Sequence, residues 1–162
     1  MATSTALDQT GFRTSQGQVA PGMHREVISG VGATRTLKSS ESGALVLFDK
    51  ADGIVYTLPS APELGCQFEF CTTVTITSGA AKTITSGGKF LLGTIFGYTT
   101  DATEIDGFIA DGSTIVAISS NGSTTGGVFG DAYKVTYNGT AWVITGSIFC
   151  GTSTPATPFA TS

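Results

Sequence analysis

Short runs in which apolar and polar residues alternate recur along the chain, separated by glycine, asparagine, aspartate or proline. Residues 73–77 alternate threonine with valine and isoleucine, and residues 67–70 alternate polar residues with phenylalanine. A period of two places successive side chains on opposite faces of a β-strand, and we find no stretch with the 3.6-residue period of a helix. We therefore expect an all-β fold, an antiparallel β-sandwich or barrel of about 9–11 short strands.

The composition supports this expectation. The chain of 162 residues contains 27 Thr, 16 Ser and 22 Gly, which together make 40% of it, and only 12% of the residues are charged. Soluble globular chains have roughly 25% charged residues. A mean hydropathy of +0.22 argues against disorder, and threonine and glycine are poor helix formers. The composition predicts a β-protein with a neutral surface coated in threonine.

Charge and hydropathy exclude two classes of partner. Eight Lys and Arg against twelve Asp and Glu give a net charge of −4, which provides no basic stripe for nucleic acid. The longest apolar stretches, residues 44–48 and 115–118, are too short to span a bilayer, and residues 1–20 lack the pattern of a secretory signal. We therefore expect neither a nucleic-acid partner nor a membrane partner.

The chain divides by pattern into three parts. Residues 1–38 show no sustained period and predict an extended N-terminal arm, with a short strand at residues 25–28. Residues 39–150 form the predicted β-domain, and residues 151–162, with two prolines, form a predicted C-terminal tail. An arm without a core gains order only by lying on another surface, so we expect both arms to contact neighbours in an assembly.

Several turns are predicted from their residue types. Residues 44–49 and 54–58 flank an Asp/Gly turn and predict a hairpin, and residues 83–87 repeat residues 75–79, which predicts a second hairpin rather than a solenoid. Asn138-Gly139 predicts a third hairpin, with a two-residue type I′ turn. In this hairpin Trp142 is expected to lie across from Val135 or Tyr137 and to anchor the core.

Two further predictions concern the strands between these hairpins. Residues 89–98 predict a strand that is broken or bulged at Gly93. Residues 105–110 and 114–119 predict two strands joined by a turn at Asp111-Gly112.

A search for catalytic residues finds no set that could work together. The single histidine, His24, lies in the arm, and Cys66, Cys71 and Cys150 are scattered and are expected to be small, buried, apolar thiols. Residues 122–126 have the spacing of a nucleophile elbow but carry threonine at the centre, in a predicted loop. We expect no catalytic residue, no cofactor and no enzymatic activity.

One acidic cluster and two sequons need an interpretation. Asp101, Glu104, Asp106 and Asp111 could bind calcium, but they lack the spacing of an EF-hand and are expected to be solvated loop carboxylates. Asn121 and Asn138 begin glycosylation sequons and are interpreted as Asn-Gly turn residues.

Surfaces with few charges tolerate large protein contacts, because burying charges is costly. We therefore expect a homo-oligomer, with a trimer favoured.

Three segments resemble small virion proteins of tailed bacteriophages: residues 45–59, residues 61–70 with the Thr-Val-Thr-Ile-Thr-Ser run after them, and residues 134–146. The resemblance implies a non-enzymatic head decoration (cement) protein, bound to the major capsid protein on the outer surface of the virion. The alternative is a tail or fibre module that binds a host receptor or glycan; we expect exposed aromatic platforms for a glycan site, and Trp142 is predicted to be in the core. The resemblance transfers no functional residue.

Overall fold

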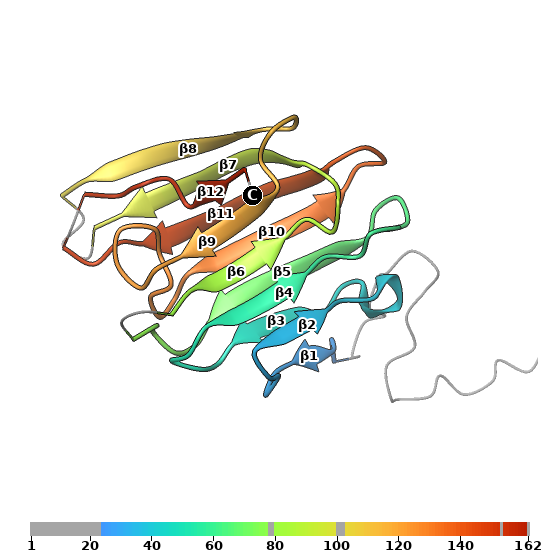
Figure 1. Cartoon of the computed structure of the whole chain (residues 1–162), viewed down its shortest axis with the longest axis horizontal. Helices are drawn as coiled ribbons and strands as arrows, with labels where there is room; N and C mark the ends of the chain where they lie inside the picture. Colours follow the sequence, from blue (N-terminus) through green and yellow to red (C-terminus); the bar gives the residue numbers. More distant parts are fainter. Residues whose placement is uncertain (1–23, 78–79, 100–102, 153, 162) are drawn as a thin grey trace, which may run out of the picture.

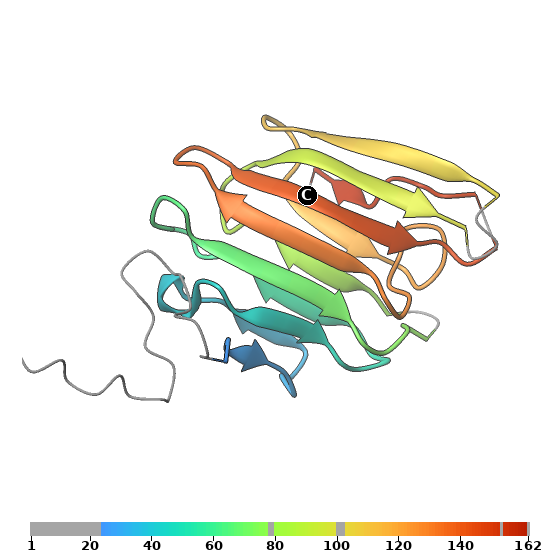
Figure 2. The same cartoon turned by 180° about the vertical axis from the view of Figure 1, so that it is seen from behind.

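The computed structural model describes residues 24–77, 80–99, 103–152 and 154–161. Within these residues the chain forms twelve strands and one turn of 3-10 helix, Ser39–Glu41, and the strands build two sheets packed face to face (Figures 1 and 2). The all-β sandwich expected from the sequence is therefore confirmed.

The two sheets differ in size. The larger has seven strands in the spatial order β1 (Val27–Ile28), β3 (Leu45–Phe48), β5 (Gln67–Thr72), β10 (Ala132–Tyr137), β11 (Trp142–Phe149), β7 (Leu91–Tyr98) and β8 (Ile105–Asp111). The smaller has five strands in the order β12 (Phe159–Ala160), β9 (Ala117–Ser120), β6 (Lys82–Thr85), β4 (Ile54–Thr57) and β2 (Thr34–Thr36).

Both sheets are mixed, which corrects the antiparallel arrangement expected from the sequence. The first half of the chain alternates between the layers, so β1, β3 and β5 lie parallel in one sheet and β2, β4 and β6 lie parallel in the other. Three two-strand units are therefore stacked in the manner of a flattened β-solenoid, an arrangement that the sequence argued against.

The hairpin predicted for residues 44–58 is wrong for the same reason. β3 and β4 lie in different sheets, and the turn between them crosses from one layer to the other. Phe48 and Tyr56 meet across this gap, with ring centroids 5.1 Å apart in an edge-to-face contact. The predicted pairing of residues 75–79 with 83–87 is also absent from the described residues, because Thr85 lies in β6 whereas Thr75 lies in a loop.

The hairpin of β10 and β11 is confirmed, with a longer loop than predicted. Tyr137 pairs with Trp142, so four residues form the loop in place of the two of a type I′ turn. The Asn138 side-chain oxygen accepts hydrogen bonds from the backbone N–H of Thr140 and of Ala141, both at 2.9 Å. This side chain closes the longer loop, and Trp142 is fully buried across from Tyr137, as expected.

Gly93 does not break its strand. β7 runs without interruption beside the parallel strand β11, and Gly93 lies opposite Ile144. The Gly93 φ of +139° is one that side chains other than glycine's rarely adopt, and a Cβ there would lie 2.0 Å from the Ile144 carbonyl oxygen. Glycine is required here because the two backbones approach closely, not because the strand bends.

The strands β8 and β9, predicted to follow one another across the Asp111-Gly112 turn, lie in different sheets. A turn between two apolar runs thus again joins the two layers rather than the two strands of a hairpin.

The sequence placed the boundaries of the domain too far inward. β1 and β2 lie within the predicted arm, Ile28 and Leu37 are buried in the core, and Arg25 forms an ion pair of 2.6 Å with Glu69 on β5. At the other end, Phe159 in β12 packs against the core. Residues 1–23 of the predicted arm lie outside the described residues.

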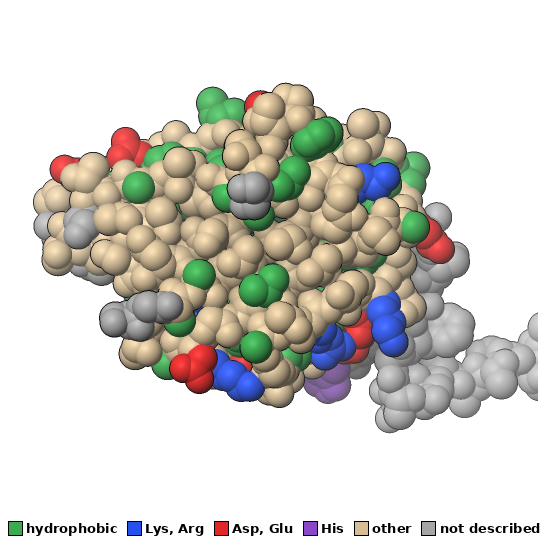
Figure 3. Space-filling view, viewed as in Figure 1, with side chains coloured by type: hydrophobic (Ala, Val, Ile, Leu, Met, Phe, Trp, Pro, Cys, Tyr) green, Lys and Arg blue, Asp and Glu red, His purple; other side chains and the backbone are tan. Residues whose placement is uncertain are grey.

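The outer face of the five-stranded sheet carries the threonine that the composition predicted. Thr36, Thr57 and Thr85 lie side by side on β2, β4 and β6, and the hydroxyl groups of Thr57 and Thr85 are 3.0 Å apart. Figure 3 shows this side of the molecule, on which the charged side chains lie mainly near the margin. Threonine hydroxyl groups therefore give the outer face of this sheet its polar character, although the chain has few charged residues.

Candidate interaction surface

The residues considered for catalysis or metal binding do not come together. His24 is exposed at the start of the described chain. Cys66, Cys71 and Cys150 form no disulfide within the described residues; Cys71 is half-buried and the other two are buried. Across the described ranges, no group of three His, Cys, Asp or Glu side chains is arranged to hold a metal ion. Residues 122–126 form a tight loop with an isolated bridge between Ser123 and Gly126.

The acidic cluster is divided between a strand and a turn. The Asp111 carboxylate accepts hydrogen bonds from the backbone N–H of Ser113 and Thr114, both at 2.8 Å, and from the Thr114 hydroxyl at 2.6 Å. These bonds, of which the Thr114 hydroxyl contributes most, hold the pKa of Asp111 well below its ordinary value. Glu104 and Asp106 are exposed, and Asp101 lies outside the described residues. Asp111 therefore caps a turn.

Asp131 is the buried carboxylate whose pKa is most disturbed. Its two oxygens accept hydrogen bonds from the backbone N–H of Phe149 (2.7 Å) and of Gly127 (2.5 Å), so it ties the loop before β10 to the end of β11. Burial, the largest effect, raises the pKa of Asp131 to about 6 despite these bonds and the nearby Lys82. Each oxygen accepts a backbone N–H from a different segment, so Asp131 holds these two segments together.

This geometry predicts a pH-dependent stability. The folded state holds the Asp131 proton up to about pH 6, whereas the unfolded chain releases it near its ordinary value of 3.8. Protonation of Asp131 therefore contributes fully to the free energy of unfolding below about pH 4. This contribution, about 2–3 kcal/mol, is lost as the pH rises through about 6. Chemical denaturation of the wild type and of Asp131→Asn between these pH values measures it.

In Asp131→Asn an amide N–H₂ faces a backbone N–H, so we expect a loss of about 1–3 kcal/mol at pH 7 and no step between pH 4 and 6. The exposed Asp52→Asn is the matched control and should keep both the stability and the step. An Asp131→Asn variant with the pH profile of the wild type would contradict this role.

The most unusual surface is an apolar patch on the outer side of the seven-stranded sheet. On β7 and β8, four large apolar side chains point away from the core, with exposed fractions of 40% for Leu92, 48% for Phe96, 61% for Ile105 and 77% for Ile109. We call these four residues the apolar outer face. Exposed apolar side chains gathered on one face mark interaction sites more often than scattered ones do.

Strand pairing brings these side chains together. In the antiparallel pair of β7 and β8, Phe96 lies opposite Gly107. A Cβ added at Gly107 would lie 3.6 Å from the Phe96 ring. Tyr98 lies opposite Ile105, and its ring contacts that of Phe149 on β11 with centroids 6.3 Å apart. The inward side chains of the same strands, Ile95 and Ala110, are fully buried. The alternation of each strand thus leaves one apolar row outside.

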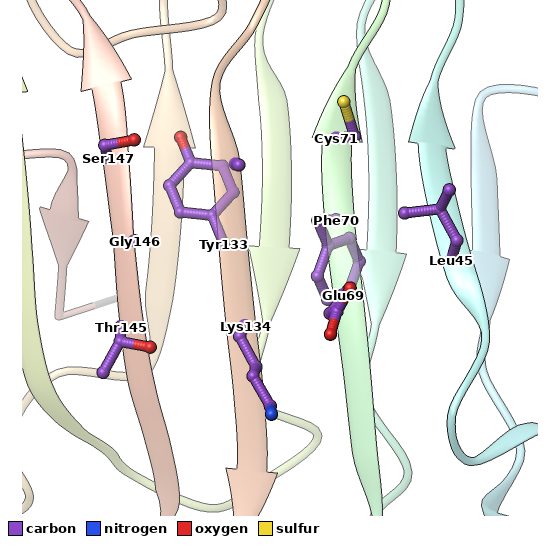
Figure 4. Close-up of a pocket in the computed structure, with 10 residues that line it drawn as sticks. Leu45, Glu69, Phe70, Cys71, Tyr133, Lys134, Thr145, Gly146 and Ser147 are labelled. Atoms are coloured by element: carbon purple, nitrogen blue, oxygen red, sulfur yellow. The ribbon is translucent and has the colours of Figure 1, made fainter. Parts of the chain in front are cut away.

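A shallow depression of about 540 Å³ lies on the same sheet, over β3, β5, β10 and β11 (Figure 4). It is lined by Leu45, Cys71 and Ser147 together with the charged Glu69 and Lys134. The Glu69 carboxylate is already paired with Arg25. The outer side of this sheet is therefore charged in part over β5 and β10 and apolar over β7 and β8.

Sequence reasoning missed the apolar outer face. It recognised residues 89–98 and 105–110 as apolar strands but could not tell which of their side chains the second sheet covers. The signal that was available is the surplus of apolar residues in β7, where both alternate sets carry Leu, Ile or Phe. A strand with apolar residues on both faces needs a cover on both.

Comparisons with known proteins do not place the chain in a family. No family model matches it, and no curated protein is significantly similar to it. No helix in the described part of the chain is long and apolar enough to cross a membrane.

Proposed function

We propose that this chain is a non-enzymatic virion structural protein, a decoration protein that binds the major capsid protein on the outer surface of a phage head. The observation that carries the proposal is the apolar outer face, four exposed apolar side chains on adjacent strands of a rigid sheet. The resemblance of residues 45–59, 61–70 and 134–146 to small phage virion proteins supplies the kind of partner.

The energetics of the face suit protein attachment. Complete burial of one large apolar side chain contributes about 1.5–3 kcal/mol. Because Ile105 and Ile109 are largely exposed, contact with a partner can bury most of their apolar surface. The neighbouring Thr94 and Thr145 are neutral, so contact with a flat partner desolvates few charges. A rigid sheet also loses little conformational entropy on binding.

The alternative function, a tail or fibre module that binds a glycan or receptor, lacks a comparable feature. Trp142, the aromatic side chain best suited to stack on a sugar, is fully buried. Phe96 and Phe129 are exposed, but they lie on different elements. We therefore favour attachment to the head.

The test mixes purified protein with heads of the encoding virus that lack it, and measures bound protein after sedimentation. We expect the wild type to bind and to raise the temperature at which the heads disrupt. Phe96→Lys places a charge in the middle of the apolar outer face and is expected to weaken binding by about 30-fold, equivalent to about 2 kcal/mol. Leu64→Lys adds the same charge at an exposed loop residue and should bind like the wild type.

Two results would reject the proposal. One is equal binding of Phe96→Lys and the wild type, which excludes the apolar outer face as the attachment surface. The other is binding to host cells or purified glycans without binding to heads, which favours the tail module.

A further inference from the structure

We infer that two copies of this chain associate by pairing their β8 strands antiparallel, which joins two seven-stranded sheets into one. This inference concerns the purified protein and does not depend on the proposed function. β8 is a long edge strand, some of its backbone groups point to the open edge, and one register matches it to a second copy.

β8 is the only long edge strand in the described part of the fold. The other three sheet edges are formed by β1, β2 and β12, which have two, three and two residues, whereas β8 has seven. Proteins protect sheet edges by keeping edge strands short or covered. Figure 2 shows β8 along one margin of the larger sheet, with β1 at the opposite margin.

The hydrogen bonds to β7 show which backbone groups of β8 are free. The N–H of Gly112 donates to the Leu91 carbonyl (2.8 Å), and the N–H of Thr99 donates to the Glu104 carbonyl (3.2 Å). Since the bonded pairs of an antiparallel ladder alternate, the even-numbered residues of β8 face β7. The N–H and C=O groups of Ile105, Gly107 and Ile109 therefore point to the open edge.

The sequence of β8 is self-complementary in one register. With the twofold axis at Gly107, Ile105 of each copy lies opposite Ile109 of the other. The two most exposed large apolar side chains within the strands therefore contact one another across the pair. In this register Asp106 lies opposite Phe108, and no acidic residue lies opposite another. Apolar cross-strand pairs stabilise a sheet, and opposed like charges destabilise it.

Neighbouring registers lack this match. An axis one residue earlier places two Asp106 carboxylates opposite one another, and an axis one residue later places Ile105 opposite Asp111. The same acidic residues thus discourage unspecific pairing at the edge and select one alignment. Leu92 and Phe96 of each copy remain on the outer side of the joined sheet, so the pair presents two apolar outer faces side by side.

The β8 strand of a second copy is a better partner for this edge than the short edge strands β1, β2 and β12 of a neighbour. Pairing of β8 with β1 of a neighbour would use only two residues of β1. An antiparallel pair of identical strands closes with two copies, so this contact gives a dimer rather than the trimer expected from the sequence.

Sedimentation velocity of the full chain measures the state of association. We expect a dimer in a reversible equilibrium, and we expect Gly107→Pro to raise the dissociation constant at least tenfold. Proline there removes a free N–H while leaving the bonds to β7 intact, and circular dichroism checks that the variant folds. Ile109→Lys, which disrupts the apolar pair without a backbone change, should have the same effect, and Leu64→Lys should have none.

Disulfide formation tests the register. Paired Gly107 Cα atoms would lie about 5.5 Å apart, within the range that a disulfide spans. In a Cys71→Ser background, Gly107→Cys should give a covalent dimer on oxidation, whereas Asp106→Cys and Phe108→Cys should give little. A monomer at all concentrations, a trimer, or preferential cross-linking at residue 106 or 108 would overturn the inference.

Discussion

Replacing Gly93 with alanine should lower the free energy of unfolding by about 3–5 kcal/mol. The added Cβ would lie 2.0 Å from the Ile144 carbonyl oxygen, and alanine would have to adopt a φ of +139°. Neither strain can be relieved locally, because the contact is with the backbone of β11 across a parallel pair. Chemical denaturation followed by tryptophan fluorescence measures the change.

Gly107→Ala provides the matched control for Gly93→Ala. Gly107 lies on the neighbouring strand β8, and a Cβ there would make an ordinary 3.6 Å contact with the Phe96 ring. We expect a change within about 0.5 kcal/mol for this variant. Equal effects at the two positions would mean that β7 and β11 do not approach as closely as described.

Truncating Trp142 to alanine should cost about 3–5 kcal/mol, because it removes the largest fully buried side chain of the core. Its ring packs against Tyr137 (centroids 5.4 Å apart) and Phe68 (6.2 Å), so a cavity would open between three aromatic residues. Among the described residues the buried indole N–H has no hydrogen-bond partner, which places the expected loss toward the lower end of this range.

The control for Trp142→Ala is Leu64→Ala, at a loop side chain that is 78% exposed. We expect almost no change there, and thermal unfolding followed by circular dichroism compares the two variants. A loss below about 1 kcal/mol for Trp142→Ala would contradict its central place in the core.

Local pattern was sufficient to predict the strands and several of their contacts. The alternation in β5 and β10 follows the burial of Phe68, Phe70, Tyr133 and Val135, and the Asn-Gly pair does mark a hairpin with Trp142 beside Tyr137. These features depend on neighbours in sequence, which a single chain displays directly.

The path of the chain between the sheets could not be predicted in the same way. An Asp/Gly turn after β3 reverses the chain equally well within one sheet or between two, and the choice depends on whether Phe48 meets Tyr56 across the core. Gly93 has the same ambiguity, since a bulge and a close parallel neighbour both require glycine. Only the packing of distant strands resolves these cases.

The apolar outer face escaped prediction for a related reason. Ile105 and Ile109 look like core residues in the sequence, and they are exposed because they lie on the side of β8 that points away from the second sheet. The chain carries more strand surface than its own two sheets cover. We propose that a partner surface covers that excess.

We propose that the protein attaches to the outside of a phage head through the apolar outer face. A cryo-electron microscopy reconstruction of phage particles that carry this chain, detailed enough to place strands, tests this proposal. We expect density for this sandwich on the outer capsid surface, with Leu92, Phe96 and Ile109 covered by the capsid. Density in the tail, or on the head with these side chains facing solvent, would contradict it.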